Sequence, residues 1–92
     1  MSEIFTISYI MKPYKSSYIC WESTEELAKN VVLNLKNNDS STIPIQNIVI
    51  EKCYPSINSK SKVVAFFVFD GRNWLETTIP DWVTEYRNWA FT

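Results

Sequence analysis

Residues 63–69 form the feature that most constrains the fold, a run of seven apolar residues built from valine, phenylalanine and one alanine. Successive side chains of a β-strand point to opposite faces of the sheet, so a strand with this sequence is apolar on both faces. Such a strand is stable only where both faces are covered. The run therefore predicts a central strand, with another layer of structure on each side of the sheet.

The N-terminal part of the chain has the alternation of a β-hairpin. Residues 3–11 alternate as a strand whose two faces can both pack against other parts of the protein. Residues 17–22 resume the strand pattern after a turn at Pro13. Two such segments with a short loop between them are typical of a hairpin. Strict alternation in the second strand sets Ile19 and Trp21 on one face, and Tyr18 and Cys20 on the other.

Two further strands are expected around the apolar run. Residues 45–54 alternate, with Ile48 and Ile50 on one face of a third strand. Asp70-Gly71 is a tight-turn sequence. It predicts that residues 72–78 return as a strand paired with the apolar run.

A helix is predicted over residues 24–37. Ser23 can cap its first turn, and Glu26 can reach back to the cap, which is the capping-box pattern. Leu33 falls on the polar side of this helix. The expected apolar stripe consists of Leu27, Ala28, Val31, Val32 and Leu35.

A second helix is predicted to follow Pro80, which suits a first helical turn. Its expected apolar stripe is Trp82, Val83, Tyr86, Trp89 and Ala90, and Phe91 lies off that stripe. The element order is β-β-α-β-β-β-α. It predicts a single α+β domain over residues 1–92, with a mainly antiparallel sheet of four to five strands. The helix at 24–37 should cover one face, and the C-terminal helix the other face or an edge.

The residue types argue against catalysis. The chain has no histidine, one glycine (Gly71) and two cysteines, Cys20 and Cys53. Histidine is the usual acid or base at neutral pH, and glycine-rich loops cradle phosphates. Both cysteines fall inside predicted strands, where a buried thiol behaves as a small apolar group. No pair of carboxylates has a spacing that singles it out. We therefore expect no enzymatic activity, no metal site and no cofactor.

The aromatic residues favour a binding role. Four tryptophans, five tyrosines and five phenylalanines exceed what one small core needs. Tryptophan and tyrosine are the residues that most often anchor protein–protein contacts. The residues least explained by core packing are Tyr14, Trp21, Trp89 and Phe91. They are the predicted contacts for a partner protein or for a second copy of the chain.

A more specific hypothesis is a small inhibitor that blocks a larger protein sterically, such as a phage anti-defence protein or an immunity protein. Abundant isoleucine, asparagine, lysine and serine are typical of an AT-rich genome, as in bacteriophages and low-GC bacteria. The N-terminus has the pattern of a strand rather than of a signal peptide, and no segment is suited to spanning a membrane. The cytoplasm is the expected compartment.

Two alternatives remain open at this point. Loop lysines could bind nucleic acid, and the candidates are Lys12, Lys15, Lys60 and Lys62. The net charge of −1 and the two arginines favour a protein partner over nucleic acid. The chain could also be a structural subunit that forms a homo-oligomer and binds no separate ligand.

Overall fold

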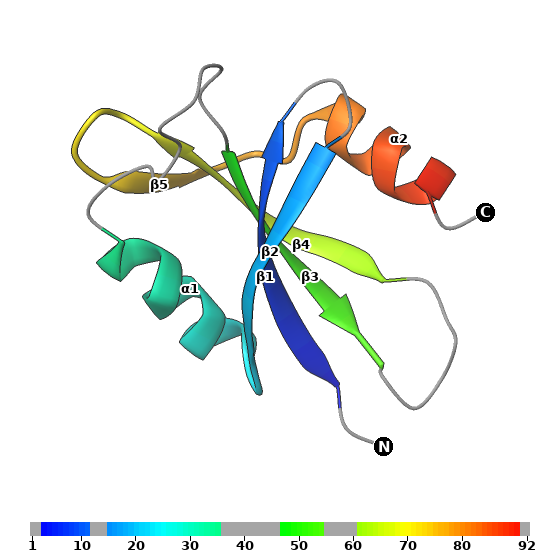
Figure 1. Ribbon diagram of the computed structural model, residues 1–92, viewed down its shortest axis with the longest axis horizontal. Helices are drawn as coiled ribbons and strands as arrows, with labels where there is room; N and C mark the ends of the chain where they lie inside the picture. Colours follow the sequence, from blue (N-terminus) through cyan, green and yellow to red (C-terminus); the bar gives the residue numbers. More distant parts are fainter. Residues whose placement is uncertain (1–2, 12–14, 36–46, 55–60, 91–92) are drawn as a thin grey trace.

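The computed structural model describes residues 3–11, 15–35, 47–54 and 61–90, with side chains described over 3–10, 18–35, 47–54 and 61–85. The element order confirms the predicted α+β fold, and Figure 1 shows the arrangement. Five antiparallel strands form one sheet in the order β2-β1-β3-β4-β5. The elements are β1 (Ile4–Met11), β2 (Lys15–Glu22), α1 (Glu25–Asn34), β3 (Asn47–Cys53), β4 (Lys62–Phe69), β5 (Trp74–Thr77) and α2 (Asp81–Ala90).

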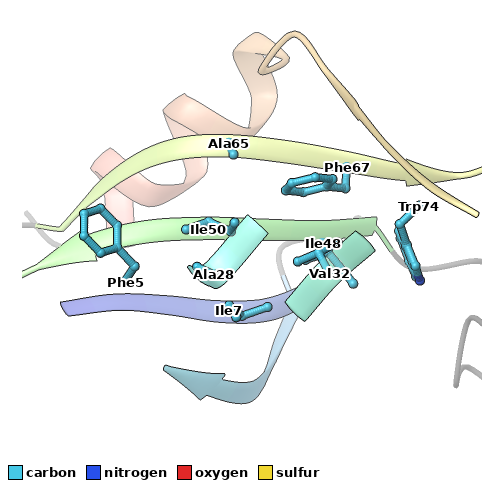
Figure 2. Close-up of a cluster of buried hydrophobic side chains, with 9 residues drawn as sticks. All are labelled: Phe5, Ile7, Ala28, Val32, Ile48, Ile50, Ala65, Phe67 and Trp74. Atoms are coloured by element: carbon cyan, nitrogen blue, oxygen red, sulfur yellow. The ribbon is translucent and has the colours of Figure 1, made fainter. Parts of the chain in front are cut away.

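The sheet has an apolar cluster on each face, as the run at 63–69 predicts. Phe67 of β4 is buried with Ala28 and Val32 of α1, and Figure 2 shows this cluster. Its neighbour Phe66 is buried in a second cluster with Val83 of α2. Consecutive strand residues point to opposite faces, so α1 and α2 cover opposite faces of the sheet. The first cluster consists of Phe5, Ile7, Ala28, Val32, Ile48, Ile50, Ala65, Phe67 and Trp74, and the second of Ile10, Val49, Phe66 and Val83.

Helix α1 begins one residue later than predicted. Thr24, not Ser23, is the N-cap, and its side chain accepts a hydrogen bond from the Leu27 N–H at 3.2 Å. A cap at Thr24 puts Leu27 at the third helical position, so Glu26 cannot complete a capping box with Ser23. Leu27 is 46% exposed rather than part of the buried stripe, whereas Leu33 is exposed as predicted.

The connection from β4 to β5 is longer than the sequence suggested. Phe69 pairs with Trp74, so four residues form the loop and β5 begins at Trp74 rather than at residue 72. The Asp70 carboxylate accepts hydrogen bonds from the backbone N–H groups of Asn73 at 2.7 Å and Arg72 at 2.8 Å. These two donors lower the pKa of Asp70 below its ordinary value. Gly71 adopts a φ of 103°, which a glycine tolerates without strain.

Helix α2 starts directly after Pro80. The Pro80 carbonyl accepts from the Val83 N–H at 3.1 Å, which is the first hydrogen bond of the helix. The Trp82 ring meets Phe66 edge-to-face with the ring centroids 6.3 Å apart. Among the described residues, α2 packs against β4.

Candidate protein-interaction surface

Strand β2 is an edge strand of the sheet, and it contains a β-bulge. Cys20 pairs with Ile7 of β1, but the next pair along β1 joins Ser8 to Tyr18. Ile19 is therefore an extra residue without its own partner on β1. A bulge of this kind changes the phase of the strand, so that the side chains before and after it no longer follow strict alternation.

The bulge places two aromatic side chains on the same face. Tyr18 pairs with Ser8 and Trp21 pairs with Thr6. Because Ser8 and Thr6 are two residues apart on β1, they point to the same face, and so do their cross-strand partners. The sequence-based assignment of Tyr18 and Trp21 to opposite faces was therefore wrong. Strict alternation holds only for an uninterrupted ladder.

The same bulge directs the residues between these two aromatics toward the core. Ile19 and Cys20 both pack against the cluster under α1. Burial, and then the charge of Glu22, raises the pKa of the Cys20 thiol. A raised thiol pKa keeps Cys20 in its less reactive protonated form at neutral pH. Cys53 pairs with Ile4, whose side chain points to the face opposite α1, and neither cysteine forms a disulfide in the described part of the chain.

Tyr18 and Trp21, called the aromatic pair below, are both exposed. The exposed fraction is 60% for Tyr18 and 53% for Trp21. They lie on the face opposite α1. The helix on that face, α2, packs against β4, which is separated from β2 by β1 and β3. The aromatic pair thus stands on the edge strand of the sheet.

The sheet beside the aromatic pair is lined by polar groups. Glu51 of β3 pairs with Thr6 of β1, and it is 1% exposed, whereas a carboxylate on a strand is usually solvated. Its carboxylate accepts a hydrogen bond from the Ser61 hydroxyl at 2.8 Å. The Thr6 hydroxyl donates to the Glu51 carbonyl at 3.5 Å and lies 3.8 Å from the Cys53 sulfur. The hydrogen bond from Ser61 offsets part of the cost of burying the Glu51 carboxylate.

Within the described ranges no three histidine, cysteine or acidic side chains are grouped to hold a metal ion.

The candidate nucleic-acid residues are not all in one place. The backbone of Lys15 pairs with Met11 at one end of β1. Lys62 pairs with Lys52, which in turn pairs with Phe5 near the other end. These two positions are six residue steps apart on β1, or roughly 20 Å along the strand. The structure therefore does not bring Lys15 and Lys62 together. Lys12 and Lys60 lie outside the described residues.

The predicted partner-binding residues are placed only in part. Trp21 is exposed on β2, as expected. Trp89 lies within α2, but its side chain is outside the described set, and Tyr14 and Phe91 are outside the described residues altogether. Tyr18 is the residue that the sequence reasoning missed. Strict alternation assigned Tyr18 to the face opposite Trp21, and the register shift that pairs it with Ser8 depends on β1.

Comparisons with protein-family models, with curated proteins and with solved structures gave no match to this chain. Neither helix in the described part of the chain has the length and apolar character needed to cross a membrane. The candidate surface therefore has to be interpreted from its own geometry.

Proposed function

We propose that this protein is a non-enzymatic binding domain that docks another protein on the aromatic pair. The observation that supports this most directly is the exposure of Tyr18 and Trp21 on one face of an edge strand. Tryptophan and tyrosine dominate binding energy at protein interfaces because each buries a large rigid surface at little entropic cost. The bulge places both side chains on one face of a strand that is paired with β1 along its length, which supports the two as neighbouring parts of one contact surface.

The specific form of the proposal is a small inhibitor. A domain of 92 residues that binds through two adjacent rings can cover a functional site on a larger protein without any chemistry of its own. The raised pKa of Cys20 is consistent with a thiol that takes no part in catalysis. An anti-defence or immunity-type protein acting in the cytoplasm is the role we infer for such a blocking domain.

The test uses a partner protein that co-purifies with the parent chain from cells of its source organism. Trp21→Ala should weaken the affinity for the purified partner by about 2 kcal/mol, which is roughly thirtyfold, and Tyr18→Ala should also weaken it. Leu33→Ala is the matched control, because Leu33 is 48% exposed on α1, away from the aromatic pair. Isothermal titration calorimetry measures all three affinities.

The outcome that contradicts the proposal is equal affinity for the parent, Trp21→Ala and Tyr18→Ala. A second arm separates nucleic acid from protein. Exposed aromatic rings can stack on bases, and phosphate contacts weaken steeply with salt. We expect no binding of single-stranded DNA or RNA at physiological salt. If the parent binds single-stranded DNA or RNA and Trp21→Ala abolishes that binding, the aromatic pair recognises nucleic acid rather than protein.

A further inference from the structure

The outer edge of β2 is the second notable feature of this strand. No strand lies beyond β2 in the described part of the sheet, so half of its backbone N–H and C=O groups have no ladder partner there. Edges of this kind accept a further strand from another chain. The pairing with β1 shows that a strand can stay in phase with β2 on both sides of the bulge, with Ile19 left as the extra residue.

A second copy of β2 can pair with this edge in one register that keeps both flanks in phase. Lys15, Ser17, Cys20 and Glu22 pair with Met11, Tyr9, Ile7 and Phe5 of β1, respectively. These β1 residues are spaced by two, so the four β2 residues point to the same face of the sheet and direct their backbone hydrogen bonds to the same side. An antiparallel second β2 that sets Lys15 opposite Glu22 and Ser17 opposite Cys20 brings Tyr18 opposite Tyr18 of the second copy, because Tyr18 is one ladder step from both Ser17 and Cys20. The two extra residues, one Ile19 from each copy, then lie on either side of this centre, and both flanks stay in phase.

The charges on β2 favour the same register. The strand begins with a lysine and ends with a glutamate. Full antiparallel overlap of two copies therefore puts a positive residue opposite a negative one at both ends, and opposite charges stabilise a cross-strand pair. A contact in which the same patch meets itself is the usual design of a two-fold dimer.

We propose that two copies of this chain associate through β2, antiparallel and about a two-fold axis at Tyr18, so that their sheets become one continuous sheet. The axis is perpendicular to the sheet, so the aromatic pairs of both copies lie on the same face, with the two Tyr18 side chains next to each other. This inference goes beyond the proposed function and does not depend on it. Self-association is measured with no other partner present.

The first experiment exchanges the charges and uses analytical ultracentrifugation of the full chain. The parent should sediment as a dimer at micromolar concentration. Lys15→Glu should raise the dissociation constant of the dimer by about tenfold or more, because both end pairs become repulsive. Adding Glu22→Lys to that variant should restore the dimer. Lys62→Glu makes the same change of charge at the exposed first residue of β4, away from β2, and should leave the dissociation constant of the dimer unchanged.

The second experiment tests the register. In a Cys53→Ser background, Ser17→Cys should form an intermolecular disulfide with Cys20 of the second copy, because directly opposed strand residues have Cα atoms about 4.5–5.5 Å apart. Mild oxidation should give a dimer on a non-reducing gel, and Thr77→Cys, at an exposed position of β5 on the opposite edge of the sheet, should not. A monomeric parent overturns the proposal. So does a dimer that the charge exchange does not restore, or one in which Ser17→Cys does not cross-link.

Discussion

The two faces of the sheet differ in how much of their surface is buried by apolar packing. Beneath α1, buried side chains from four strands and the helix form one continuous apolar cluster. On the opposite face the apolar cluster is smaller and centres on Phe66 and Val83. Toward β2 that face carries Thr6, the buried carboxylate of Glu51 and the exposed aromatic pair. One face therefore carries a broad apolar cluster, whereas the other has polar groups and two exposed aromatic side chains toward β2.

The placement of the helices explains this difference. Helix α1 packs across β1, β2, β3 and β5, whereas α2 packs against β4. Lys29 of α1 contacts the Glu76 carboxylate of β5 at 3.1 Å and Glu25 at 3.2 Å, which ties the helix to the far edge of the sheet. Both contacts raise the pKa of Lys29, with Glu76 as the larger cause. Broad cover by α1 leaves little of its face for a partner.

The largest expected effect is the difference in unfolding free energy between a substitution on one face of the sheet and a substitution on the other. Phe67→Ala, in the cluster under α1, should lower the free energy of unfolding by about 3–5 kcal/mol, because it leaves a cavity in a fully buried site. Trp21→Ala, on the opposite face, should change it by no more than about 0.5 kcal/mol, as for most exposed positions. Urea unfolding followed by circular dichroism measures both. Comparable losses in the two variants would show that Trp21 belongs to a core.

A smaller effect concerns how α1 is held over its face. Thr24→Ala should cost about 1 kcal/mol, because it removes the hydroxyl that accepts from the Leu27 N–H. Ser23→Ala is the matched control and should have little effect, since Ser23 precedes the cap. The same urea titration distinguishes them. If Ser23→Ala were the more damaging change, the helix would begin where the capping-box pattern first placed it.

The smallest effect lies in the β4–β5 loop, which joins the two strands at the edge far from the aromatic pair. The folded state lowers the pKa of Asp70, so its carboxylate stabilises the fold above its ordinary pKa of about 4. That contribution is lost as the pH falls through the lowered value. The difference in unfolding free energy between the parent and Asp70→Asn should therefore be largest near pH 7 and should shrink below about pH 4. A difference that stays constant from pH 7 to pH 2 would exclude this role for the charge.

Much of the fold could be predicted because the decisive patterns are local. Alternation assigned Ile48 and Ile50 to one face of β3, and the buried set under α1 confirms it. The run at 63–69 predicted cover on both faces, which Phe66 and Phe67 now show in separate clusters. The candidate site was predicted only in Trp21. Its companion Tyr18 was assigned to the wrong face.

The sequence by itself determined which segments form strands and helices, and which side chains share a face wherever a strand is regular. Those properties follow from a period of two or of about 3.6 residues along one segment. The tertiary structure decided that β2 lies at the edge of the sheet and that Ile19 is the extra residue of its pairing with β1. Strand order and register depend on contacts between distant segments, so no local pattern in residues 15–22 could specify them. The aromatic pair exists because of that register.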